Sequence, residues 1–292
     1  MYKQIAANKR NTIFIMGFFV LIVGAIGWVV AYFTEDWAVL TWVFIVALVY
    51  AIVQYFASAS IAVAMTGAKQ IQKKDNPRFY NTVENLSIAT GLPMPKVYII
   101  DDPAPNAFAS GRDPKHAVVA ATTGLLDIMD NKELNAVMAH EMSHVKNYDI
   151  RVSMITFGLV CLVGYIADLG LRMMLYTSHH DDDDSSPIGL IVMLLVSIVA
   201  PIAASLAQLA VSREREYLAD ASAAHITRYP EGMISALKKL EVHGRPMHRQ
   251  NPATEAMFIN SPLKKGAIKN LFSTHPSIEK RIERLEHGKS KF

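Results

Sequence analysis

Cysteine and charged residues are scarce in this chain. Its 292 residues include one cysteine, Cys161, and only 19% of them are charged. A single thiol excludes an intrachain disulfide and a thiolate zinc cluster, so any metal must be bound by histidine and carboxylate side chains. The formal net charge of +3 comes from scattered basic residues, which argues against a nucleic-acid-binding surface.

Hydrophobic residues make up 51% of the chain, too many for an ordinary soluble domain of this length. They concentrate in four apolar segments, at 12–33, 37–64, 152–175 and 187–211. Each is long enough for the roughly 20 helical residues that span a bilayer. The first exceeds the roughly 7 to 15 apolar residues of a signal peptide, so an uncleaved anchor is favoured over a cleaved signal. Only Thr34–Asp36 separates it from the second, which predicts a transmembrane hairpin.

The third segment is less uniform, because Asp168 and Arg172 lie within it. At a spacing of four residues they share one helix face, either as a neutralised pair near the outer interface or as a polar lining of a helix bundle. Whether this segment crosses fully stays open. The run "HHDDDD" at 179–184 is interpreted as a solvated loop rather than a weak divalent-ion site.

Basic residues predict the orientation of these segments, because they favour the cytoplasmic side. They precede the first segment and follow the second and fourth: Lys3, Lys9, Arg10, Lys69, Lys73, Lys74, Arg213 and Arg215. Acidic residues occupy the opposite loops. Both termini and the part between the second and third segments are therefore expected in the cytoplasm.

The parts between these segments are mixed in polarity. Apolar residues at helical spacing precede Gly91, and "KVYII" at 96–100 is typical of a strand. "NAFASG" and "HAVVAAT" are two further strand candidates, so a small sheet beside helices is expected. The predicted fold is a mainly α membrane protein with four transmembrane helices and a cytoplasmic domain containing that sheet. The expected boundaries are 1–65 for the first hairpin, 66–151 for the first cytoplasmic part, 152–211 for the second hairpin and 212–292 for the second cytoplasmic part.

The stretch "AVMAHEMSHVKNYD" contains the pattern H-E-x-x-H. On a helix, His140 and His144 lie on one face and can direct their imidazole nitrogens at one metal ion. Glu141 flanks that point, where it can take a proton from water whose pKa zinc lowers to about 7. Asp130 and Glu133 match a capping box at the start of this helix, which argues against two chance surface histidines.

The third ligand must be another histidine or carboxylate. "REREYLADASAA", directly after the fourth segment, offers Glu216 and Asp220 four residues apart, among alanines that let another helix approach. We expect Glu216 to bind the metal and Asp220 to hydrogen-bond the outer nitrogen of a metal-binding histidine. The alternative is an interfacial charged cluster with Arg213 and Arg215. An antiparallel third and fourth segment would bring the three ligands together at the membrane surface.

These stretches, with "NAFASG" and "THPSIEKRIERL", resemble the HtpX heat-shock membrane metalloproteases, relatives of the CAAX prenyl proteases. The resemblance covers nearly the whole chain. It implies an inner-membrane zinc endopeptidase, with one zinc ion per chain, that faces the cytoplasm and degrades damaged or misfolded membrane proteins under stress. Its zincin-like catalytic domain would consist of the two cytoplasmic parts, 66–151 and 212–292. By the same resemblance, His140, His144 and Glu216 match the zinc ligands and Glu141 the general base. Asp220 matches the family's E-x-x-x-D carboxylate.

The resemblance also implies two further site residues. Asn106 begins "NAFASG", which matches an edge strand near the cleft, and such a strand can bind an extended substrate by backbone hydrogen bonds. His275 and Arg281 match the family's H-P-x-x-x-x-R pattern. His275 is predicted to stabilise the oxyanion or, alternatively, to cap the helix before Pro276, and no role is assigned to Arg281.

Three functions fit this chemistry. The first is peptide-bond hydrolysis by zinc-activated water with Glu141 as general base. The second is a membrane scaffold or holdase with a structural zinc. The third is processing of lipidated C-termini. Because a structural zinc normally has four protein ligands and only three are found, the sequence favours hydrolysis.

Overall fold

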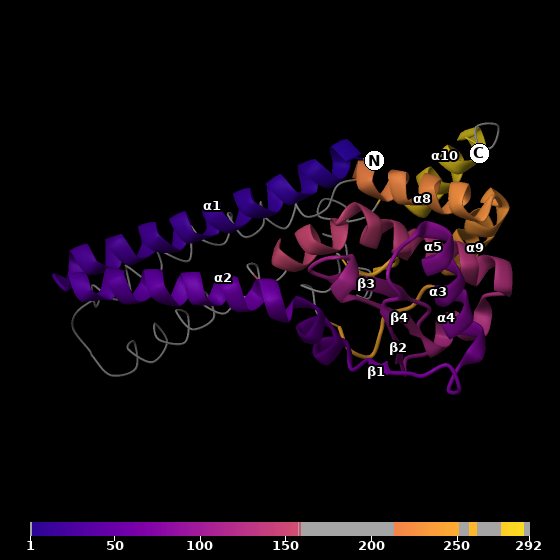
Figure 1. Ribbon diagram of the computed structural model, residues 1–292, viewed down its shortest axis with the longest axis horizontal. Helices are drawn as coiled ribbons and strands as arrows, with labels where there is room; N and C mark the ends of the chain where they lie inside the picture. The colour runs from indigo at the N-terminus through magenta and orange to yellow at the C-terminus, as the bar shows by residue number, and fades with distance from the viewer. Residues whose placement is uncertain (1, 157, 159–212, 251–256, 262–275, 289–292) are drawn as a thin grey trace, which may run out of the picture. The chain divides into compact units, whose positions relative to one another are not determined.

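The computed structural model describes residues 2–156, 158, 213–250, 257–261 and 276–288 (Figure 1). Contacts divide these residues into two compact units. The first, called the α/β unit, contains residues 2–9 and 57–154 with the described residues from 213 onward. The second, called the hairpin unit, contains residues 10–56 and the few described residues after 154.

Helices α1 (Tyr2–Thr34) and α2 (Trp37–Thr66) form the predicted hairpin. Asp36 caps the start of α2, because its carboxylate accepts a hydrogen bond from the Ala38 N–H at 2.9 Å. A Cβ atom at Gly27 would lie 2.8 Å from Val43, so glycine lets the two helices pack closely.

Apolar stretches within both helices have the length and composition of membrane spans. They cover Ile5–Trp28 and Leu40–Ala57, each with a mean hydropathy of 2.0. Many of their large apolar side chains are exposed, which fits a lipid-facing surface. The fourth predicted span, nearly all of the third, and the run at 179–184 lie outside the described residues.

The α/β unit contains a four-stranded sheet in the order β1-β2-β4-β3. Its strands are β1 (Lys69–Gln70), β2 (Lys96–Ile100), β3 (Ala107–Gly111) and β4 (Ala117–Thr122). Strands β2 and β4 are parallel, and the other two pairs are antiparallel. The three predicted strands are thus confirmed. The sequence did not predict β1, because two residues are too few to show an alternating pattern.

The chain is helical at 149–156, and six further α-helices belong to the described part of this unit. They are α3 (Pro77–Thr90), α4 (Thr123–Ile128), α5 (Asn131–Asn147), α8 (Arg213–Thr227), α9 (Pro230–His243) and α10 (Ile278–Gly288); a 3-10 turn, η1 (Pro114–His116), precedes β4. Helix α3 ends at Gly91, whose φ of 68° favours glycine.

Helix α5 lies at the centre of the unit and packs against α3, α8, α9 and β3 (Figure 1). Its capping box forms as predicted. Asp130 accepts from the N–H groups of Lys132 and Glu133, and the Glu133 carboxylate accepts from the Asp130 N–H. On α8, Ala219, Ala223 and Ala224 are fully buried, so small side chains let α5 and α8 approach closely.

The outer edge of β3 is paired with a segment from late in the chain, Met257–Ser261. The Ile259 N–H donates to the Ala107 carbonyl at 3.1 Å, and Phe258 forms an antiparallel bridge with Phe108. The two phenylalanine rings meet edge to face, with centroids 5.3 Å apart. The edge that the sequence predicted to be available for substrate is therefore partly occupied by the chain itself.

Candidate metal centre

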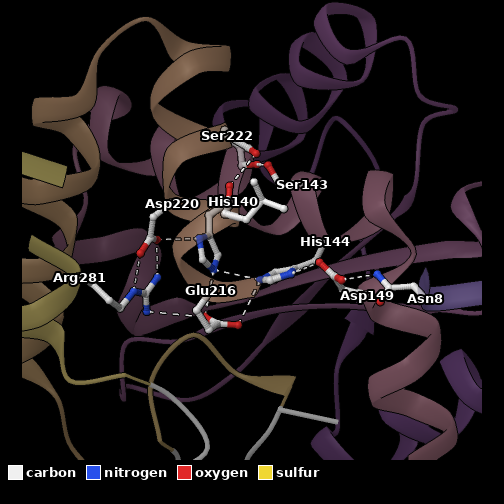
Figure 2. A network of polar contacts seen from close by, with 11 residues as sticks. Asn8, His140, Ser143, His144, Asp149, Glu216, Asp220, Ser222 and Arg281 are labelled. Atoms are coloured by element: carbon white, nitrogen blue, oxygen red, sulfur yellow. Dashed lines mark hydrogen bonds and ion pairs between the residues drawn. The ribbon is translucent and has the colours of Figure 1, made fainter. Parts of the chain in front are cut away.

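Helix α5 brings His140 and His144 together. Their Nε2 atoms are 3.2 Å apart, although the residues are a full turn apart along the helix (Figure 2). Helical geometry explains the pairing, because side chains at i and i+4 share one face.

Glu216 on α8 completes a compact triangle of possible ligand atoms. Its carboxylate oxygens lie 3.6 Å from His140 Nε2 and 3.5 Å from His144 Nε2. Ligand atoms about 2.0 Å from a tetrahedral zinc ion are about 3.3 Å from one another. The two Nε2 atoms match that edge length, and each of them has one Glu216 oxygen nearby. With one ligand atom taken from each residue, all three atoms lie within 4.8 Å of one another, close enough to bind one small divalent cation.

Two carboxylates fix the orientation of the imidazole rings. Asp220 Oδ1 lies 2.9 Å from His140 Nδ1, and Asp149 Oδ2 lies 3.0 Å from His144 Nδ1. Each carboxylate favours a proton on the Nδ1 atom that it faces. Both Nε2 atoms are thereby directed at the point that Glu216 also faces (Figure 2).

The electrostatics of this cluster favour a positive charge at its centre. Burial alone would lower the pKa of His140, but hydrogen bonding to Asp220 and Glu216 outweighs burial and raises that pKa to about 9. The pKa of His144 is also raised, because the hydrogen bond to Asp149 and the charge of Glu216 outweigh burial. Either a proton or a divalent cation can supply the positive charge that the carboxylates around the two imidazole rings favour. Imidazole nitrogen with carboxylate oxygen is a typical zinc ligand set.

Glu141 lies beside this triangle and is almost fully buried. Burial raises the pKa of its carboxyl, which makes the carboxylate a stronger proton acceptor. A cavity contains Glu141 together with the three possible ligands. Apolar residues also line this cavity: Ala109 of β3 with Met257, Phe258 and Ile259.

Residues 73–289 match the family model described as peptidase family M48. This range covers most of the chain and includes the whole triangle with Glu141. The chain belongs to peptidase family M48.

Two curated relatives that are similar over the full length of this chain are both named protease HtpX homolog. This M48 chain is 53% identical to the protease HtpX homolog of Tropheryma whipplei (strain Twist) over 100% of both chains. It is 44% identical to the protease HtpX homolog of Ligilactobacillus salivarius, over 98% of this chain and 99% of that one. The resemblance predicted from the sequence is confirmed, and the chain is a membrane-bound metallopeptidase that acts on polypeptides.

The crystal structure of S. mikatae Ste24p has a similar fold. The match has a TM-score of 0.52 at 18% identity and covers 98% of this chain and 67% of that one. At this identity the similarity shows a shared fold alone.

Two predicted site residues of this M48 peptidase are not found at the cavity. One lies away from it, and the other lies outside the described residues. Asn106 is buried, and its side-chain amide pairs with the backbone of Asn260, donating at 2.8 Å and accepting at 3.2 Å. Asn106 therefore fixes the segment that covers β3, and it does not line the cavity. His275 lies outside the described residues.

Three residues that support the triangle had no role predicted from the sequence: Asn8, Asp149 and Arg281. Arg281 binds Asp220 through two hydrogen bonds, of 2.8 Å and 2.7 Å. Its position contained a signal, because it falls on the same helical face as Ile278 and Leu285 and so predicts a buried arginine. Asp149 follows His144 closely, but Asn8 is far away in sequence and has no local signal.

Proposed function

We propose that this M48 peptidase is a zinc endopeptidase in which His140, His144 and Glu216 bind one zinc ion. The observation that carries this proposal is the triangle of two Nε2 atoms and one carboxylate, with ligand atoms all within 4.8 Å of one another. Three side chains converge among the described residues, and this number is typical of catalytic zinc, which keeps a position for water or substrate.

Glu141 is proposed as the general base. Bound zinc would supply Lewis-acid chemistry, polarising the scissile carbonyl and acidifying water. The Glu141 carboxylate then takes the proton from water as it attacks, and afterwards donates that proton to the leaving amine. Its raised pKa suits both steps, because a carboxylate that holds a proton more tightly is a better acceptor and still a competent donor.

Substitution of Glu141 tests this assignment. We expect Glu141→Gln to retain bound zinc and to reduce cleavage of an unfolded polypeptide by about 10²–10⁴-fold, the usual contribution of acid–base catalysis. His144→Ala should lose the metal as well. Zinc content is measured by atomic absorption, beside peptide cleavage and self-cleavage in detergent.

Lys146→Ala, on the same helix, is the matched control and should retain both zinc and activity. Glu141→Gln with normal cleavage would falsify the role of Glu141. Bound zinc without any cleavage by the unaltered protein would favour a scaffold with a structural metal.

We also propose the placement in the cell. The chain would cross the bacterial inner membrane four times, with the metal centre on the cytoplasmic side and the boundaries 1–65, 66–151, 152–211 and 212–292. The apolar stretches of α1 and α2 and the basic residues that flank them support this placement. Its substrates would be damaged or misfolded membrane proteins.

A further inference from the structure

The start of α1 is anchored to the end of α5, within the α/β unit. Asn8 is 2% exposed, and its Nδ2 donates to the Asn147 carbonyl at 2.8 Å and to Asp149 Oδ1 at 2.6 Å. Both partners are acceptors, so the amide nitrogen must face them. The neighbouring Lys9 ammonium lies over the Tyr148 ring, 4.6 Å from its centroid.

One of these hydrogen bonds completes the end of the helix that contains both histidines. The last carbonyls of an α-helix have no partner within the helix. Helix α5 ends at Asn147, and Tyr148 follows in a left-handed conformation with a φ of 61°. Asn8 therefore supplies a donor that α5 cannot supply itself.

The other hydrogen bond holds the partner of His144. Asp149 is 3% exposed and is bound at both oxygens, by Asn8 at Oδ1 and by His144 Nδ1 at Oδ2 (Figure 2). A carboxylate bound at only one oxygen can rotate about its Cβ–Cγ bond. The second contact opposes that rotation and so fixes the direction in which the imidazole ring points.

We propose that Asn8 is a positioning residue of the metal centre, which acts through Asp149 to hold the His144 ring in its metal-binding orientation. The start of α1 would then support the metal centre from outside the cavity. This inference rests on the proposed role of His144 as a metal ligand.

The test is a double-mutant cycle on the full-length protein in detergent, with zinc affinity measured by competition against a chromophoric chelator. Asp149→Ala should weaken zinc binding by about 10–100-fold, as for other partners of metal-binding histidines. Asn8→Ala acts one contact further out and should weaken it by about tenfold, at the lower end of that range. In the Asp149→Ala background, Asn8→Ala should cause a much smaller loss, because only its hydrogen bond to the Asn147 carbonyl is then removed.

Two further variants make the result specific. Asn11→Ala removes the same side chain from an exposed position one turn along α1 and should leave zinc affinity unchanged. Asn8→Leu keeps the size of the side chain without the donor, and it replaces Asn8→Ala if that variant does not fold. The absorption spectrum of the cobalt-loaded protein should change in both Asn8 variants, because it reports the ligand geometry.

Each outcome bears on one proposal. Zinc affinity within twofold of the unaltered protein in both Asn8 variants overturns the positioning role, and so does an equal loss with and without Asp149. If His144→Ala keeps full zinc affinity, the ligand assignment itself is wrong. If His144→Ala loses zinc while the Asn8 variants do not, only the inference about Asn8 fails.

Discussion

Arg281 and Asp220 form an ionic contact that solvent hardly reaches, with side chains 1% and 3% exposed. Burial alone would raise the pKa of Asp220, but the charge and hydrogen bonds of Arg281 outweigh burial and lower that pKa to about 2. Asp220 is thus ionised at neutral pH and is available to orient His140. Arg281 thus stabilises the negative charge of the buried Asp220 carboxylate.

Removing the arginine should be costly because a buried carboxylate would lose its counter-charge. We expect Arg281→Met to lower the free energy of unfolding by about 3–5 kcal/mol, measured by denaturant unfolding in detergent. Arg281→Met with Asp220→Leu should recover much of that stability, but it should not recover zinc affinity, because His140 still lacks its partner.

Arg284, on the same helix, provides the control. It pairs with Glu214 at 3.4 Å, with side chains 56% and 76% exposed. Because solvent screens such a pair, Arg284→Met should change stability by less than about 1 kcal/mol. Equal losses from Arg281→Met and Arg284→Met would contradict the buried role of Arg281.

At the scale of elements, the α1–α2 hairpin gives a direct test of orientation. In a Cys161→Ser background, Asp36→Cys should react with a membrane-impermeant maleimide in intact cells. Lys74→Cys should react only after the cells are permeabilised, because basic flanks favour the cytoplasm. Both residues are exposed, so each variant should react fully in detergent. Labelling of Lys74→Cys alone in intact cells would reverse the proposed topology.

Helices α5 and α8 could be predicted in detail because their signals are local. A capping box starts α5, the i, i+4 spacing places both histidines on one face, and the alanines of α8 mark a close helix contact. To predict the ligand triangle, it was then enough to infer that these two helices pack against each other.

Long-range contacts account for what could not be predicted. Asn8 and Asp149 are 141 residues apart in the sequence, and Asn106 and Asn260 are 154 residues apart. Neither pair follows a sequence period, because each depends on how distant elements meet. The covered edge of β3 was missed for the same reason: its partner is a short segment with no strand pattern of its own.

At the scale of the whole molecule, metal loading should be linked to pH. A proton and a zinc ion compete for Nε2 of His140, whose pKa of about 9 leaves the ring protonated in the metal-free protein at pH 7. Raising the pH removes that competitor, so zinc binding should strengthen until the pH exceeds about 9. We expect the apparent dissociation constant to fall by about tenfold per pH unit between about pH 6 and 8 for each proton released.

Calorimetry in buffers of different ionisation enthalpy measures this linkage directly. The expected result is the release of at least one proton per zinc bound at about pH 7. A dissociation constant that does not change with pH would show that the histidines are already neutral. Asp220→Asn, which removes the charge that raises the pKa of His140, should weaken the pH dependence.

The pairing of Arg281 with Asp220 also bears on when the enzyme becomes active during synthesis. The ribosome must translate the chain as far as residue 281 before this pair can form. Until then Asp220, the partner of His140, lacks its counter-charge, although all three metal-binding residues have already been made. We therefore expect full zinc affinity only after the segment that contains Arg281 has been made and has folded onto Asp220.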